Sequence, residues 1–416
     1  MRTFILITLF LLSFEMLTAQ HVQQSSSPNP LEILLQSNPA LKNAIANKDS
    51  LRIQIVYTQI DRNKRNKPSF TEYNYNLNNN TYFYPASTVK MPIALLALEK
   101  LNELKIKGLT KASTMITDSS ATAQDYVYTQ PNSADSRPTI ENYIKQIFLV
   151  SDNDAYNRLY EFLGQEYIQK KLSAKGYSDA IIRHRLQISR TLEQNATTNP
   201  VKLYDTSGAL VYEQPLQKSN AQYPLLEANL GKGFMSRGKL VNEPFSFATK
   251  NRVYLQDLHH ILQSVLFPEQ FKKEQRFNLT KQDYAFVQKW MSAFPKESDF
   301  PNYDSTHYWD AYCKFLYYGS EKGTKPSNFR IFNKVGDAYG FLIDVTYVAD
   351  LANNIEFMLS AVISCNQDGI YNDDHYDYET IGYPFMKNLG QAVYQYELSR
   401  KRKNTPDLSK LDLHKK

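Results

Sequence analysis

The chain has 416 residues, of which 42% are hydrophobic and 22% are charged, and its formal net charge is +6. This composition is sufficient for one large or two ordinary globular cores, and it excludes a wholly disordered polymer. The mild positive charge is spread along the chain except for a short run at the C-terminus. Since no basic stripe is interleaved with aromatic residues, we expect no nucleic-acid partner.

The first twenty residues have the order of charge and hydrophobicity that is typical of a secretory signal. Arg2 supplies a positive charge, Phe4 to Phe14 form a short apolar run, and small residues follow at Thr18 and Ala19. We therefore expect residues 1–20 to be a signal peptide and the mature protein to be periplasmic or secreted. The alternative is an N-terminal helix of the fold. The apolar run is short for a membrane span, so we expect no transmembrane segment after signal removal.

The segments that follow are predicted from composition and periodicity. Residues 21–30 are Ser- and Pro-rich, which indicates a linker. Apolar residues at helical spacing predict a helix over residues 31–49, and alternation predicts strands over 51–60 and 70–76. Longer helices are expected over residues 87–104 and 153–175.

Two apolar segments late in the chain, residues 341–349 and 355–364, predict strands that a tight connection joins as a hairpin. A last helix is expected over residues 378–402. The order helix, strands, helical middle, strands and helix predicts an α+β fold. In it, early and late strands share one antiparallel sheet flanked by helices, and the middle forms a mostly helical subdomain.

The first of three motifs that carry chemistry is Ser87-Thr88-Val89-Lys90, at the start of an apolar helix. A serine hydroxyl is a poor nucleophile until a base removes its proton, and residues three apart on a helix share a face. Lys90 can therefore reach Ser87, and burial beside other cations would lower the pKa of the lysine. Taken alone, the motif more often marks a surface serine and a solvated lysine.

The other two motifs are Ser151-Asp152-Asn153, before a predicted helix, and Lys334-Val335-Gly336, at the head of a strand pattern. Taken alone, the second motif is a helix N-cap and the third is a lysine at a strand start. In a functional interpretation, Ser151 relays a proton to the leaving group, and Asn153 binds substrate and positions the first lysine. Lys334 would support this relay and attract a substrate carboxylate.

The backbone around the third motif has an expected role of its own. Gly336 would let the substrate backbone approach the strand edge, because glycine has no side chain. The N–H groups of Asp337 and Ser87 would then hold the oxyanion that forms on the attacked carbonyl.

The three motifs, in this order, resemble those of serine β-lactamases and the related penicillin-binding D,D-peptidases, with class A β-lactamases as the closest pattern. The motif serines are 64 residues apart (151 minus 87), which is similar to that class. Thr197 to Pro200 resembles the closure of the family's Ω loop. Residues 252–267 and 277–291 resemble the two helices that precede the third motif.

The resemblance implies an exported serine hydrolase that transfers the acyl group of a β-lactam or a D-alanyl amide through an acyl-enzyme. It implies no cofactor, and the partner is a small-molecule β-lactam or a peptidoglycan-type peptide. The residues that it assigns to catalysis are Ser87, Lys90, Ser151 and Lys334, and those that it assigns to substrate binding are Asn153, Gly336 and Asp337.

The sequence departs from the class A pattern at the place of the deacylating base. Class A enzymes use a glutamate of the Ω loop to activate water, whereas the matching residues 181–192 contain no Asp or Glu. Gln187 lies near the expected place and can orient water but cannot accept its proton, and Glu193 is the next carboxylate. Val335 also removes a hydroxyl that would bind a substrate carboxylate. A β-lactamase, a slowly deacylating D,D-peptidase and an esterase therefore remain open, beside a non-catalytic cell-wall-binding protein.

We expect one β-lactamase-like domain over residues 31–402 and a charged, frayed tail over residues 403–416. Residues 201–251 have no class A counterpart and predict a surface insertion beside the active-site mouth, or a decoration without a catalytic role. The histidines form no metal-binding pattern, so no metal is expected. Cys313 and Cys365 permit a disulfide without requiring one. We expect a monomer.

Overall fold

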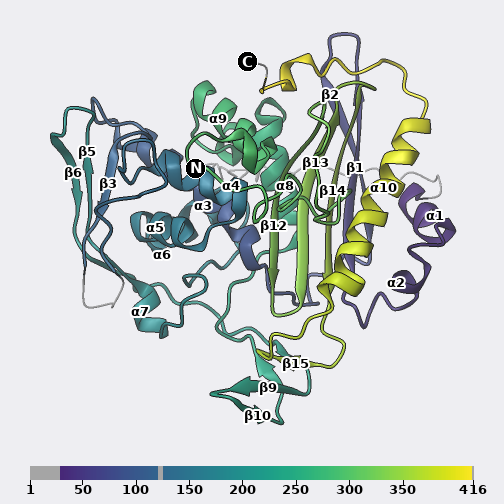
Figure 1. The fold of residues 1–416 in the computed structure, drawn as a ribbon, viewed down its shortest axis with the longest axis horizontal. Coiled ribbons are helices and arrows are strands. Elements are labelled where there is room, and N and C mark those ends of the chain that lie inside the picture. The colour runs from purple at the N-terminus through teal and green to yellow at the C-terminus, as the bar shows by residue number, and fades with distance from the viewer. Residues whose placement is uncertain (1–28, 120–124, 415–416) are drawn as a thin grey trace, which may run out of the picture.

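The structure, a computed structural model, describes residues 29–119 and 125–414 (Figure 1). Its centre is a five-stranded antiparallel sheet in the order β12-β13-β14-β1-β2. An N-terminal hairpin therefore pairs with a C-terminal meander, with Gln54 opposite Val362. The predicted α+β fold is confirmed. The strands are β1 Gln54–Arg62, β2 Pro68–Tyr75, β12 Phe329–Ala338, β13 Phe341–Asp350 and β14 Ile355–Ser364.

Helices cover both faces of this sheet. One face packs against α8 (Leu255–Leu266) and α9 (Lys281–Ser292), and the other packs against α10 (Tyr383–Ser399) and α1 (Pro30–Ser37). Neighbouring residues of β12 enter the two cores in turn, because successive side chains of a strand point to opposite faces. The predicted hairpin of late strands is confirmed, with Asp350 paired to Ile355.

A mostly helical subdomain lies beside the edge strand β12, as predicted. Its helices are α3 Lys90–Leu104, α4 Ile140–Val150, α5 Asn153–Leu163, α6 Gln165–Ala174 and α7 Leu192–Ala196. A small sheet covers its outer side (Figure 1), made of β3 Thr114–Thr117, β5 Val201–Tyr204 and β6 Leu210–Gln214. The middle of α3 is entirely buried between this subdomain and the sheet core.

Several predicted boundaries are wrong, each for a local reason. The helix expected over residues 31–49 is two helices, α1 and α2 (Lys42–Ala46), since the residue before Pro39 is disfavoured in a helix. The helix expected over residues 153–175 breaks at Gly164, whose φ is +73°. With a ψ of 153°, this backbone conformation is one that essentially only glycine adopts, so the chain turns here. The expected last helix begins with a π-helical turn, Tyr378–Gly382.

The segment 201–251 divides into two parts that lie in different places. The first part contains the β5–β6 hairpin of the outer sheet, and the pair β4 (Thr197–Thr198) and β7 (Gln217–Lys218) borders it. The second part contains four short strands and reaches the cleft described below, so only this part adjoins the expected active-site mouth. Those strands are β8 Asn229–Leu230, β9 Gly233–Ser236, β10 Lys239–Val241 and β11 Phe245–Ser246, and β9 pairs in parallel with β15 Ile370–Tyr371.

The C-terminal tail is docked rather than frayed, so that prediction is wrong. Leu408 is 2% exposed in the core that includes α8 and α9. The Asn66 side chain exchanges hydrogen bonds of 2.8 and 3.0 Å with the backbone of Asp407. His414 Nε2 lies 3.0 Å from Ser292 Oγ. The tail is held because buried leucines alternate with its charges.

The predicted signal peptide, residues 1–20, and most of the linker over residues 21–30 lie outside the described residues. The first helix already begins at Pro30, and the Asn29 side chain caps it by accepting from Leu31 N–H. Within residues 29–119 and 125–414, no helix has the length and apolarity that a bilayer span requires. Cys313 and Cys365 are both buried free thiols.

Candidate active site

The candidate nucleophile lies on a strained turn at the start of α3. Ser87 belongs to a 3-10 turn, Ala86–Val89, in which the amide and hydroxyl of Thr88 both donate to the Pro85 carbonyl, at 3.1 and 2.6 Å. Ala86 has a φ of +47°, in the left-handed region that non-glycine residues rarely occupy. Such strain costs on the order of 1–3 kcal/mol and occurs most often at functional sites.

Gly336 brings the edge of the sheet against this turn. A Cβ at Gly336 would lie 2.9 Å from both Ser87 N and Pro85 O, so a side chain here would push the turn away. The sequence-based reason for this glycine, a close approach of substrate, was therefore incomplete, because the close neighbour is the nucleophile turn itself. The contact sets the backbone N–H of Ser87 beside the part of β12 that continues to Asp337.

Lys90 is buried and contacts each of the groups that the first two motifs predict. Its Nζ lies 2.8 Å from Ser87 Oγ, 2.7 Å from Asn153 Oδ1 and 3.3 Å from Ser151 Oγ, and it also donates to the Ser151 carbonyl. Asn153 Oδ1 and the Ser151 carbonyl oxygen can only accept, so each of them takes one hydrogen of the Lys90 amine. A neutral amine would then direct its lone pair to the Ser87 hydroxyl.

Burial lowers the pKa of Lys90 well below its usual value, and the positive charge of Lys334 lowers it further. Burial also lowers the pKa of Lys334, to about 8. A charged lysine without a carboxylate partner is costly in a buried site, so burial favours the neutral form of Lys90 that can act as a base.

Ser151 is the meeting point of the two lysines. It ends α4 in the left-handed conformation, with a φ of +59°, and Asp152 then caps α5 by accepting from Ala155 N–H at 2.7 Å. Lys334 Nζ lies 2.8 Å from Ser151 Oγ, on the side opposite to Lys90. Lys334 lies in the middle of β12 rather than at a strand head, so its placement in the strand was wrongly predicted.

The two residues proposed to position water are separated by the structure. Gln187 Oε1 accepts from Asn153 Nδ2 at 2.8 Å, so Gln187 lies beside the lysine and nucleophile, with a φ of +64°. Glu193 does not enter the site: its side chain is 74% exposed and pairs with Lys218 at 2.8 Å. Residues 184–195 form one wall of the cleft; those that line it are 184–190, 192 and 195, and none of them carries a carboxylate.

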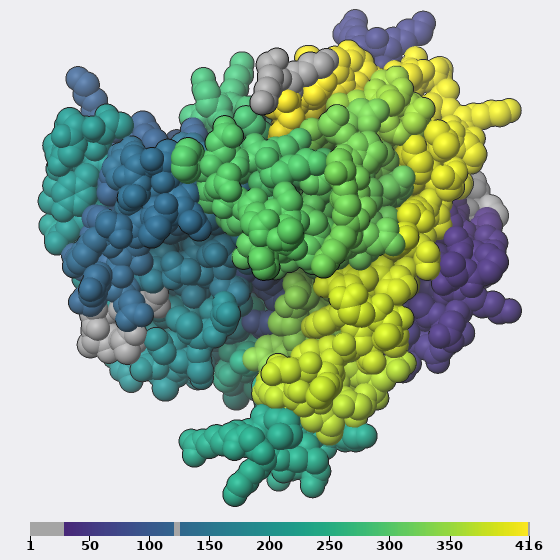
Figure 2. Space-filling view, viewed as in Figure 1, coloured from purple at the N-terminus to yellow at the C-terminus, as the bar shows by residue number. Residues whose placement is uncertain are grey.

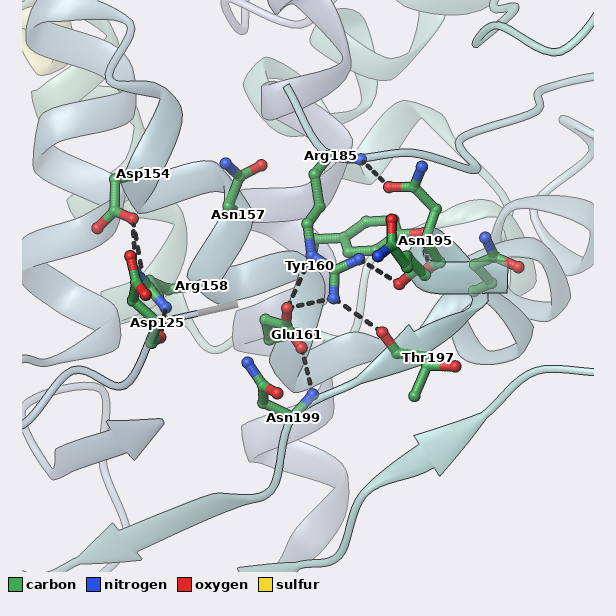
Figure 3. A network of polar contacts seen from close by, with 12 residues as sticks. Asp125, Asp154, Asn157, Arg158, Tyr160, Glu161, Arg185, Asn195, Thr197 and Asn199 are labelled. Atoms are coloured by element: carbon green, nitrogen blue, oxygen red, sulfur yellow. Dashed lines mark hydrogen bonds and ion pairs between the residues drawn. The ribbon is translucent and has the colours of Figure 1, made fainter. Parts of the chain in front are cut away.

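A buried ion pair, which no sequence pattern indicated, holds this wall. Glu161 of α5 is fully buried, and Arg185 Nε donates to it at 2.7 Å (Figure 3). The same guanidinium donates to the carbonyls of Gln194 and Thr197, at 2.9 and 2.8 Å, and the second Glu161 oxygen accepts from Asn199 N–H. One side-chain pair therefore ties both ends of the 185–199 segment to α5.

The site opens into a cleft of about 600 Å³ between the helical subdomain and the end of the sheet, and Figure 2 shows the surface hollowed between these parts. Ser87, Asn153, Gln187 and Asp337 all line it. Residues that the sequence analysis did not select also line it, because no local pattern marks them. They are Tyr84, His184, Lys250, Tyr339, Asp374, Tyr376 and Tyr378, with others of the 185–195 wall.

No metal centre accompanies this arrangement. Within residues 29–119 and 125–414, no group of three or more His, Cys, Asp or Glu side chains could hold a metal ion. His259 is buried between Thr58 Oγ1 and Ser360 Oγ, at 2.9 and 2.7 Å, and serves packing. His260 pairs with Glu72 at 2.8 Å.

Comparison with known proteins agrees with the motifs. Residues 38–225 match the sequence profile described as the beta-lactamase enzyme family. Among curated proteins, none matches the chain. The fold is similar to that of a β-lactamase from Chitinophaga pinensis, with 10% identity, a TM-score of 0.48 and coverage of 86% of this chain and 99% of the other. It is also similar to a class A β-lactamase from Clostridium kluyveri, with 15% identity, a TM-score of 0.45 and coverage of 85% and 97%. The matched residues include the first two motifs, so the profile match agrees with the superfamily that the motifs predict.

Proposed function

We propose, on the premise that this chain is a serine hydrolase of the β-lactamase and penicillin-binding superfamily, that Ser87 is acylated by a β-lactam ring or a D-alanyl amide. The observation that carries the proposal is the 2.8 Å contact between Ser87 Oγ and a buried Lys90 whose other contacts occupy its hydrogens. Retention of a full proton path argues for an enzyme rather than a binding module.

In this mechanism, neutral Lys90 takes the proton of Ser87 as the serine oxygen attacks the carbonyl carbon. The N–H groups of Ser87 and Asp337 stabilise the negative oxygen of the tetrahedral intermediate. The proton then passes from Lys90 to the Ser151 hydroxyl, which gives its own proton to the leaving nitrogen as the carbon–nitrogen bond breaks. The contacts of 3.3 and 2.8 Å from the two lysines to Ser151 Oγ support this route.

We propose further that hydrolysis of the acyl-enzyme is slow compared with its formation. An amide cannot take a proton from water near neutral pH, and Gln187 is hydrogen-bonded to Asn153 where a base would be needed. Glu193 pairs with Lys218 away from the cleft and offers no replacement. This favours a penicillin-binding behaviour over a fast class A β-lactamase.

We also propose that the protein is exported. The order of a positive charge, an apolar run and small residues over residues 1–20 supports a signal peptide and a periplasmic or secreted protein. In that compartment the chain meets peptidoglycan peptides and β-lactams, which are the substrates that the proposed chemistry requires.

Intact-protein mass spectrometry after mixing with benzylpenicillin tests the proposal. We expect the mass to rise by one whole penicillin, because ring opening loses no atoms, and the adduct to persist for minutes to hours. Ser87→Ala must abolish the adduct. Rapid return to the free mass with accumulation of penicilloate would contradict slow hydrolysis, and no adduct at any time would contradict acylation by β-lactams.

A further inference from the structure

The side chain of Asp337 has no role in the chemistry above, although its backbone N–H does. Its carboxyl group is exposed in the cleft that contains Ser87. Within residues 29–119 and 125–414, no hydrogen bond or ion pair reaches this carboxylate. The preceding residue, Gly336, packs against the nucleophile turn, so the unpaired charge belongs to the residue that follows this contact.

Tyrosine side chains line the same part of the cleft as this carboxylate. Tyr376 and Tyr378 line the same cleft, with ring centroids 5.6 Å apart, and the ring of Tyr383 lies 6.4 Å from that of Tyr378. The negative charge of Asp337 contributes to raising the pKa values of Tyr378, Tyr383 and Tyr312 after burial, so all three lie within its electrostatic reach. A carboxylate among aromatic faces is suited to an ammonium group.

The cations of the site are engaged elsewhere. Lys334 Nζ donates to Ser151 Oγ and to the Val335 carbonyl, both at 2.8 Å. Lys250 Nζ donates to Tyr339 Oη at 3.1 Å, and the Arg185 guanidinium is bound by Glu161. Burial raises the pKa of the Asp337 carboxyl and the positive charges of Lys334 and Lys90 lower it, but none of the described cations forms an ion pair with it.

The neighbouring strand supplies no cation either. Asp344 of β13 lies opposite Val335 and is buried, where it accepts from Phe315 N–H, Leu316 N–H and Asn333 Nδ2 at 2.8 to 3.0 Å. Val335 itself is 1% exposed. The buried Val335 and Asp344 on this part of the sheet therefore offer no cation that could pair with the Asp337 carboxylate.

We propose that the Asp337 side chain binds a cationic amine of the acyl donor, and that the natural substrate is a peptide-like amide with a free amino group close to the scissile bond. The inference rests on the proposed function, since it takes Ser87 as the acylated residue. It adds a specificity-determining contact on the sheet side of the cleft. An amine placed there would neutralise the carboxylate and lie against the tyrosine rings.

A matched pair of β-lactams tests this inference. Ampicillin carries an α-amino group on the acyl side chain, and benzylpenicillin lacks it, whereas the ring and its carboxylate are the same. We expect the second-order rate constant of acylation, followed by mass spectrometry, to be about tenfold higher for ampicillin, as a charge-assisted contact allows. In Asp337→Asn this ratio must fall towards one. In Asp374→Asn, which removes another exposed carboxylate of the same cleft, the ratio should change less than twofold.

A second measurement does not depend on acylation. In the Ser87→Ala protein, isothermal titration calorimetry compares the affinities for the two penicillins, with and without Asp337→Asn. We expect ampicillin to bind about tenfold more tightly only when Asp337 is present. A preference that is absent, or that survives Asp337→Asn, overturns the inference. Failure of the wild-type protein to form an adduct overturns the proposed acylation instead, and the calorimetric comparison still decides the role of Asp337.

Discussion

Replacing Glu161 by glutamine tests whether the buried ion pair holds the cleft wall. The carboxylate accepts from Arg185 Nε, Arg185 Nη2 and Asn199 N–H, and both side chains of the pair are at most 1% exposed. Glutamine keeps one oxygen, but its amide nitrogen must face one of these donors. Arg185 would then remain buried with an incomplete set of acceptors and no counter-charge. Breaking a buried pair in this way costs about 3–5 kcal/mol.

Urea unfolding at neutral pH, followed by the fluorescence of the two tryptophans, measures this loss. We expect Glu161→Gln to lower the free energy of unfolding by about 3 kcal/mol with little change in the slope against urea. We also expect slower acylation of Ser87, because the wall contains Gln187. Glu193→Gln is the control, because it also removes a carboxylate from the 185–199 segment, but an exposed one that pairs with Lys218. This variant should not shift the unfolding curve.

If Glu161→Gln lowers the free energy of unfolding by less than about 1 kcal/mol, the reasoning is refuted, because a buried guanidinium without a counter-charge should destabilise the fold by more than that. A large loss in stability with unchanged acylation would keep the energetic argument and refute the claim that the pair positions the wall.

Three further predictions concern the chemistry. Lys90→Met should slow acylation by benzylpenicillin about 10³-fold, because Ser87 then has no base, as measured by the rate of adduct formation. Raising the pH through about 8 removes the positive charge of Lys334, whose pKa burial lowers to about that value, so the acylation rate by this anionic substrate should decline between pH 7.5 and 9. Gln187→Glu should shorten the lifetime of the adduct at least about tenfold, because a carboxylate there can accept a proton from water.

Each of these predictions has its own control. Circular dichroism must show that Lys90→Met is folded, and a rate within tenfold of wild type would assign the base to another group. Lys334→Arg keeps its charge above pH 9, so its rate should not decline in that range; a decline at the same pH would point to a different titrating group. An unchanged lifetime in Gln187→Glu, beside the neutral Gln187→Asn, would show that water is not activated from this wall.

The motif residues came together because their spacing follows simple rules of the backbone. Ser87 and Lys90 share one helix face, and Asn153 opens a helix that a neighbouring aspartate caps, so both placements depend on local geometry. The apolar runs of β13 and β14 likewise predicted their strands and hairpin, because both strands are buried over their whole length.

The parts that sequence did not predict depend on contacts between distant segments. Glu161 and Arg185 carry no pattern that pairs them, and the charges around Leu408 conceal a tail that docks on α9. The reason for Gly336 is also tertiary, since the turn that it admits belongs to another element.

The strand order has a consequence for biosynthesis. The inner edge of β1 pairs with β14, and Gln54 and Val362 are 308 residues apart (362 minus 54). While the ribosome makes the intervening chain, the β1–β2 hairpin carries an open, apolar edge with no strand to cover it, and such edges promote aggregation. The central sheet can close only after β14 has been synthesised. Until then, the unpaired edge of β1 is the part of the early chain most exposed to association with other chains.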